Sequence, residues 1–180
     1  MNIDNQGARV LAFELLSGRF GFAVLEGMRL IDAGARSYSR ADYGKSFATL
    51  SSLFDFFRPE AIAIADEGNW QAQRLSGARS TVKLVEHETN LRSLPLHRIK
   101  KSEMVAALPR VHRGTRYEIA AAVALIFPEL AWKVPPQRKP WQTAHRNQVL
   151  FEAIALGIAC SLRLRDHPII EECDQNGAAA

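Results

Sequence analysis

The sequence predicts a single α/β domain built around a mixed five-stranded sheet. Three short runs joined by tight turns lie near the N-terminus, two further short apolar runs are flanked by segments with helical periodicity, and 180 residues is close to the size of one domain. Strands joined by tight turns form an antiparallel meander, whereas strands separated by helices are added in parallel. We therefore expect three antiparallel strands and two parallel crossovers, flanked by helices.

The first three strands are expected at residues 9–15 (RVLAFEL), 20–25 (FGFAVL) and 29–36 (RLIDAGAR). The first run alternates between two faces, as a half-buried strand does, and the second repeats the pattern. The sequences SGR and EG separate the runs and supply the turn-forming residues of a meander.

Two helix-and-strand units are expected in the middle of the chain. Residues 45–57 show helical periodicity and end just before Pro59, which cannot continue a helix. The apolar run at 61–65 (AIAIA) predicts a buried strand. Residues 70–89 predict the second helix, and residues 94–99 predict the strand that follows it.

The C-terminal half is expected to be mainly helical. A short helix is predicted at 101–108, and a clear one at 115–127, where Pro128 stops it. Three prolines within 132–141 predict an extended loop. The last helix is expected at 144–164 and is apolar over much of its surface.

Composition assigns residues 1–165 to one domain and residues 166–180 to an acidic, solvated and disordered tail. Only two cysteines, Cys160 and Cys173, are present, which is too few for a disulfide framework or a four-cysteine zinc site. No apolar run reaches the roughly 18 residues of a membrane span, and no leader sequence precedes the first strand. We expect a cytoplasmic protein that does not enter membranes.

Positive charge is concentrated in one section of the chain. Eleven Lys and Arg residues but only three acids lie between Arg92 and Arg146, although the whole chain has a net charge of only +4. Such a section is typical of a protein that contacts phosphates, and solvated helix faces are the alternative explanation. The candidate nucleic-acid contacts are Arg98, Lys100, Lys101, Arg110, Arg113, Arg116, Arg138, Lys139 and Arg146.

Several carboxylates occupy positions where a core residue is expected. Alternation places Glu14 on an apolar strand, Asp66 and Glu67 follow the run AIAIA, and Glu152 has mostly apolar neighbours on the last helix. If the first and fourth strands are adjacent and the last helix covers them, these acids converge. A convergent cluster of carboxylates repels itself unless it holds cations, and oxygen ligands suit Mg²⁺ or Mn²⁺.

Each acid also has an explanation without a metal. Glu14 can point to water from the end of its strand, and the two acids after AIAIA can be turn residues. Glu152 can pair with Arg146, Lys139 or Arg138. The metal hypothesis requires the carboxylate oxygens to meet closely, with no lysine or arginine between them.

Five segments taken together resemble the RuvC-type Holliday junction resolvases of the RNase H-like superfamily. They are VLAFELLSGRFGFAVLEGMRLIDAG, RPEAIAIADE, GTRYEIAAAVALIFPEL, RKPW and RNQVLFEAIALGIA, in that order. The resemblance spans roughly residues 9–164, nearly the whole domain. It implies an RNase H-like fold and a divalent-metal-dependent, structure-selective endonuclease that acts as a homodimer on branched DNA such as Holliday junctions, in DNA recombination and repair.

The resemblance also assigns site residues. Glu14 falls at the family's first-strand Asp, Asp66 or else Glu67 at its fourth-strand acid, and Glu152 at its last helical Asp, so these residues are the expected catalytic residues and ligands of Mg²⁺ or Mn²⁺. Glu replaces Asp at two of these places. The family's further acid, one helical turn before Glu152, has no acidic match here.

His145 and Gln148 are placed on the same face of the last helix as Glu152, and either can help to orient water or metal.

The altered acids favour an alternative function, a catalytically impaired nucleic-acid-binding or scaffold protein on the same fold. A third class, the sugar-kinase or actin-like ATP-binding proteins, opens with a similar meander but requires a second half-domain, for which 180 residues leave no room.

Overall fold

In a computed structural model of the chain, the structure describes residues 7–16, 18–37, 43–66, 78–137 and 145–166. Its centre is a single five-stranded sheet in the order β3-β2-β1-β4-β5. The strands are β1 (Arg9–Leu16), β2 (Arg19–Glu26), β3 (Arg29–Ser37), β4 (Ala61–Ala65) and β5 (Leu96–Ile99). The predicted mixed sheet is confirmed.

The strand directions bring several chain segments to one end of the sheet. β1 and β2 are antiparallel with Leu16 opposite Arg19, and β2 and β3 are antiparallel with Arg19 opposite Ser37. β1, β4 and β5 are parallel to one another. The last residues of β1, β3, β4 and β5 and the first residue of β2 therefore lie at the same end, which we call the carboxyl end of the sheet.

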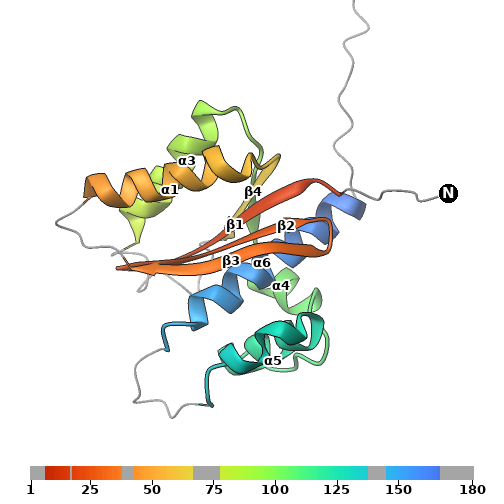
Figure 1. Cartoon of the computed structure of the whole chain (residues 1–180). Helices are drawn as coiled ribbons and strands as arrows, with labels where there is room; N and C mark the ends of the chain where they lie inside the picture. Colours follow the sequence, from red (N-terminus) through yellow and green to blue (C-terminus); the bar gives the residue numbers. More distant parts are fainter. Residues whose placement is uncertain (1–6, 17, 38–42, 67–77, 138–144, 167–180) are drawn as a thin grey trace, which may run out of the picture.

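Helices cover both faces of the sheet (Figure 1). α1 and α3 lie on one face, whereas α6 crosses the other face and is itself flanked by α4 and α5. A 3₁₀ helix, η2, follows α5. The bounds are α1 (Tyr43–Phe57), α3 (Arg79–Leu91), α4 (Lys101–Ala106), α5 (Arg116–Ile126), η2 (Pro128–Lys133) and α6 (Gln148–Asp166).

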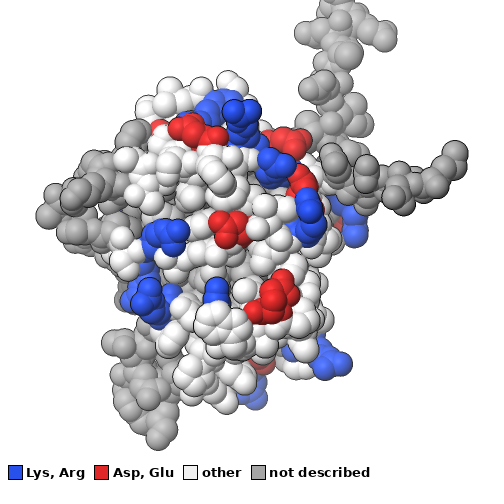
Figure 2. Space-filling model, in the orientation of Figure 1, with Lys and Arg blue, Asp and Glu red and all other residues white. Residues whose placement is uncertain are grey.

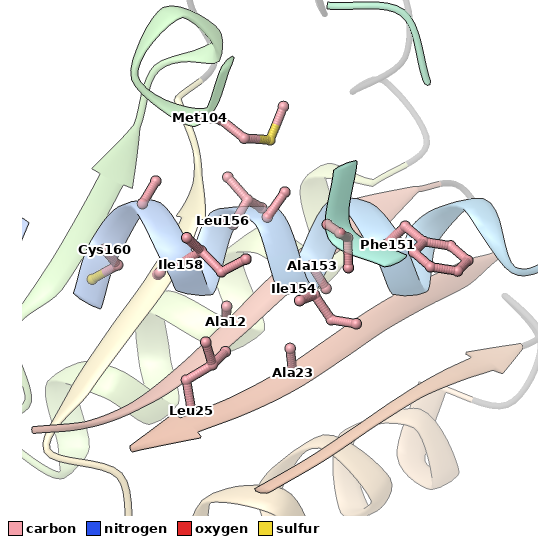
Figure 3. Packing of buried hydrophobic residues seen from close by; sticks show 14 of the residues in the cluster. Ala12, Ala23, Leu25, Met104, Phe151, Ala153, Ile154, Leu156, Ile158 and Cys160 are labelled. Atoms are coloured by element: carbon pink, nitrogen blue, oxygen red, sulfur yellow. The ribbon is translucent and has the colours of Figure 1, made fainter. Parts of the chain in front are cut away.

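The core beneath α6 depends on small side chains in the sheet. Ala12 of β1 and Ala23 of β2 lie directly under the apolar face of α6, which carries Ile154 and Ile158 (Figure 3). Small residues let the helix approach the sheet closely, and close packing of this kind is sensitive to added volume. The opposite face of β1 carries Leu11, Phe13 and Leu15, which pack with α1 and α3.

Two local features differ from the prediction. The last helix begins at Gln148, not at residue 144, because residues 146–147 form a turn in which the Asn147 side chain donates to the Lys133 carbonyl oxygen at 3.2 Å. Residues 128–133 form a 3₁₀ helix with Pro128 in its first turn, so the predicted loop starts later. Proline favours that position because a first-turn N–H has no helical acceptor.

Parts of several predictions lie outside the described residues. They are the start of the helix expected at 70–89, Glu67, Arg138, Lys139 and the tail from residue 167. Over the part of the chain that the structure describes, no helix is both long enough and apolar enough to cross a membrane.

Candidate functional site

The structure brings Glu14 and Glu152 together inside the protein. Each residue is only 3 % exposed, Glu14 on β1 and Glu152 on α6. Gly21 lies opposite Glu14 in the register of β1 and β2. A Cβ atom on Gly21 would lie 2.0 Å from the Val149 carbonyl oxygen, so the α6 backbone lies directly over β2 at this point. This close approach places the first turns of α6, and with them Glu152, beside the end of β1.

Arg116 provides the positive charge next to this pair. Its Nε lies 3.1 Å from Glu152 Oε1, and its side chain is 25 % exposed. The Gln148 amide donates to the same oxygen at 3.4 Å and to the Arg116 carbonyl oxygen at 3.1 Å. We call Glu14, Glu152 and Arg116 the acid–arginine cluster. It joins β1, α5 and α6, and it contains one arginine for two carboxyl groups.

Burial shifts the pKa values of the two acids. It raises the pKa of Glu14 well above its ordinary value, and the nearby Glu152 charge raises it further. Burial also raises the pKa of Glu152, but the Arg116 charge and a hydrogen bond with Glu14 oppose this effect. The raised pKa favours the protonated form of Glu14, whereas Arg116 and the hydrogen bond with Glu14 favour the charged form of Glu152. Glu14 Oε1 and Glu152 Oε2 are buried and have no hydrogen-bond partner among the residues that the structure describes.

A capping box holds Arg116 in place at the start of α5. The Glu118 backbone N–H donates to Thr115 Oγ1 at 3.2 Å, and the Thr115 N–H donates to the Glu118 carboxylate at 2.9 Å. Burial disfavours the Glu118 charge, but the hydrogen bond from the Thr115 N–H is the largest effect and keeps the Glu118 pKa below its ordinary value. The reciprocal bonds fix the backbone from which Arg116 reaches Glu152.

We expect Thr115→Ala to destabilise the protein by about 1 kcal/mol, because the variant loses the side-chain acceptor of the capping box. Urea unfolding followed by circular dichroism measures this change. Thr115→Ser keeps the oxygen and should cost much less. Equal losses in the two variants would contradict a capping role for the hydroxyl group.

The third expected acid does not join this pair in the described structure. Asp66 directly follows β4, is partly exposed, and donates its backbone N–H to the Ile99 carbonyl oxygen at 2.8 Å. Glu67 is outside the described residues. Among the residues that the structure describes, no three His, Cys, Asp or Glu side chains are grouped closely enough to hold a metal ion.

The described residues do not fit a hard divalent cation in their present arrangement. The unpartnered oxygens Glu14 Oε1 and Glu152 Oε2 are suitable donors, but Mg²⁺ usually takes a nearly octahedral set of oxygen ligands. Gln148 turns its NH₂ group, not its oxygen, toward Glu152. Arg116 already balances the charge of Glu152, so the requirement for a gap free of lysine and arginine is not met.

The structure places only one of the two expected auxiliary residues beside Glu152. Gln148 is buried and contacts Glu152, as its spacing predicts. His145 is exposed and precedes the helix, so the prediction that it shares a helical face with Glu152 is wrong. Its Nδ1 instead accepts a hydrogen bond from the Asn147 backbone N–H at 3.2 Å. The helix starts later than its apolar pattern suggested, and this difference moves His145 off α6.

Basic side chains gather near the carboxyl end of the sheet. Lys100 and Lys101 directly follow β5, while Arg113 precedes α5 and Arg146 precedes α6. Figure 2 shows Lys and Arg side chains on the left of the molecule, where β1 ends and α6 begins in Figure 1, and others at the top, right and bottom of the same view. The Asp and Glu side chains in this view lie toward the top, centre and right.

The remaining candidates have different surroundings. Arg98 pairs with Glu86, and Arg110 is exposed with a positive φ of 57° in the loop before α5. Sequence reasoning missed Arg19 and Arg36, which the register places opposite Ser37 and Phe20 at the carboxyl end of the sheet. Their positions at the start of β2 and the end of β3 were the available signal, because a meander brings these two ends together.

The strand order, with three antiparallel strands followed by two parallel ones and helices on both faces, defines an RNase H-like fold. More specifically, the chain has the fold of the RuvC Holliday junction resolvases. It is similar to a structure of Thermus thermophilus RuvC in complex with a Holliday junction substrate, with a TM-score of 0.65, 17 % identity, and coverage of 89 % of this chain and 96 % of that one. A second Thermus thermophilus RuvC structure gives a TM-score of 0.65 and 18 % identity over 88 % of this chain and 96 % of that one. No protein-family model matches the sequence, and no curated protein matches it significantly.

Proposed function

We propose that this protein binds branched DNA at the carboxyl end of its sheet. The observation that carries the proposal is the group of basic residues that surrounds this end, on a fold shared with a protein whose structure includes a Holliday junction substrate. Phosphate contacts from Lys and Arg supply most of the affinity of proteins for DNA and position the backbone without reading the sequence.

The acid–arginine cluster agrees better with DNA binding alone than with DNA cleavage. Cleavage by a divalent metal needs carboxylates that are ionised and available to the ion. Here burial raises the pKa of Glu14 well above its ordinary value, and Glu152 pairs with Arg116. We therefore propose that the protein recognises junctions through its basic surface and acts on them as a scaffold. That it does so as a homodimer is what the resemblance to the resolvases implies.

Metal-dependent cleavage of the bound junction is the second candidate function. It is favoured by the two buried carboxyl groups that come from β1 and α6, each with an oxygen that has no partner within the described ranges. Asp66, or Glu67 beyond the described residues, is the third acid of this candidate. Cleavage would require Arg116 to leave Glu152 and Glu14 to lose its proton.

One assay separates the two functions. Fluorescence anisotropy measures binding to a four-way junction and to linear duplex of the same composition, while denaturing gels follow strand cleavage with Mg²⁺, with Mn²⁺ and with chelator. We expect the junction to bind more tightly and to remain intact under every condition. Absence of binding at low salt would exclude both functions, whereas metal-dependent cleavage would establish the second.

Paired substitutions test where the DNA binds. We expect Arg113→Ala with Arg146→Ala to weaken junction binding by about tenfold or more and to reduce the slope of log K against log salt by about two, since two phosphate contacts are lost. The matched control is Arg79→Ala with Lys83→Ala, which removes two exposed charges from α3 on the other face of the sheet. Equal effects of the two pairs would show that binding depends only on net charge.

A further inference from the structure

Buried carboxyl groups need a positive charge beside them. In a metal centre the ion supplies this charge, whereas in the acid–arginine cluster Arg116 supplies it. Arg116 contacts Glu152 at 3.1 Å from the solvent-accessible side, whereas both carboxyl groups are buried. An isolated carboxylate in an apolar interior is unfavourable unless a cation lies next to it. Within the described structure, Arg116 makes the ion pair with Glu152, and Lys101 also acts on Glu152 electrostatically.

Arg116 is also held firmly at this position. The Thr115–Glu118 capping box fixes the start of α5, and Gln148 of α6 donates to the Arg116 carbonyl oxygen at 3.1 Å. The arginine backbone is therefore tied to the same helix that carries Glu152. A guanidinium group so placed competes with a cation for the carboxylate oxygens and repels it electrostatically.

We propose that Arg116 takes the place of a divalent cation at the Glu14–Glu152 pair, so that the protein keeps this site free of metal. Removal of the guanidinium group then converts the pair into a site for a hard divalent cation. Its ligands are the two carboxylates, whose unpartnered oxygens become available together with the oxygen that Arg116 vacates. This inference concerns metal binding in the absence of DNA, so it can fail while DNA binding stands.

Titration with Mn²⁺ tests the inference without any activity assay. Calorimetry and thermal unfolding are measured for the wild-type protein, Arg116→Ala and Arg116→Lys. We expect Mn²⁺ not to stabilise the wild-type protein. We expect Arg116→Ala to bind Mn²⁺ about tenfold more tightly than the wild type, or more, because the positive charge that repels the ion is gone. Arg116→Lys keeps a positive charge and should behave like the wild type.

A double variant shows whether the new site is the proposed one. Glu14→Gln added to Arg116→Ala removes one ligand, and we expect it to abolish the gain in Mn²⁺ binding. If Arg116→Ala is unfolded without metal, the inference expects Mn²⁺ to restore its helical circular dichroism, and failure to do so would overturn it. Mn²⁺ binding to the wild type that Glu14→Gln removes would overturn it as well.

Discussion

The variant Gly21→Ala is expected to lose about 3 kcal/mol of stability, near the upper end of the range for overpacked cores. The new methyl carbon would lie 2.0 Å from the carbonyl oxygen and 2.4 Å from the carbonyl carbon of Val149. Both atoms belong to the α6 backbone, which cannot rotate away as a side chain can. Gly21 does not have a positive φ, so alanine is acceptable to the local backbone and the cost is steric. Urea unfolding measures the loss.

Gly157→Ala is the matched control at the same helix–sheet interface. A Cβ atom there would meet Leu25 Cδ1 at 2.4 Å, the end of a flexible side chain, and would lie 3.4 Å from Ala12 Cβ. Alanine also favours a helix by up to about 1 kcal/mol relative to glycine. We expect Gly157→Ala to stay within about 1 kcal/mol of the wild type. A loss as large as that of Gly21→Ala would show that the interface is generally intolerant, without a special role for the backbone contact.

The Gly21 contact also couples stability to the candidate site. Gly21 is the register partner of Glu14, and its close approach to α6 brings Glu152 to Glu14. Displacement of α6 by a methyl group would open the pair and admit water. Gly21→Ala should therefore bring the pKa of Glu14 closer to its ordinary value and also destabilise the fold.

Local patterns predicted the strands well because alternation directly reflects burial. The face of β1 that carries Val10, Ala12 and Glu14 follows from alternation alone, and the structure places all three under α6. The burial of Glu152 follows in the same way from its apolar neighbours on the helix. Both acids could thus be identified from the sequence.

The partner of Glu152 could not be predicted, because it depends on how helices pack. Sequence reasoning considered Arg146, Lys139 and Arg138, which are close to Glu152 along the chain. The structure pairs it with Arg116, which is far from it in sequence and reaches it because α5 packs against α6. Local periodicity contains no information about such contacts, whereas the capping sequence around Thr115 does indicate where α5 starts.

The stability of the wild-type protein is expected to decrease as pH rises above the ordinary pKa of glutamate, and Glu14→Gln is expected to make this decrease smaller. Burial, and secondly the Glu152 charge, raise the pKa of Glu14 in the folded protein. Between the unfolded and folded pKa values, the folded state holds a proton that the unfolded state has lost. The free energy of unfolding therefore falls with pH in this window, with a slope of at most about 1.4 kcal/mol per pH unit for one proton.

Below the pKa that Glu14 has in the unfolded protein, Glu14 is protonated in both states, so its contribution to stability is fully present. This contribution is lost as pH rises through the pKa that Glu14 has in the folded protein. Glu152 and Arg116 act on Glu14 directly, Gln148 and Lys101 act on Glu152, and all four are retained in Glu14→Gln. Glutamine can still donate a hydrogen bond to Glu152 but cannot ionise. The stability difference between the variant and the wild type should thus increase with pH in favour of the variant.

Urea unfolding at a series of pH values in chelator measures this difference, with Glu26→Gln as the control. The partly buried Glu26 has a lowered pKa, caused mainly by its hydrogen bonds with Arg9 and Arg29, so its contribution is lost on acidification and not on the alkaline side. We expect Glu26→Gln to leave the decrease at higher pH unchanged. If Glu14→Gln and the wild type showed parallel profiles, Glu14 would be ionised in the folded protein. The expectation of binding without cleavage would then lose the argument that the raised pKa of Glu14 supplies.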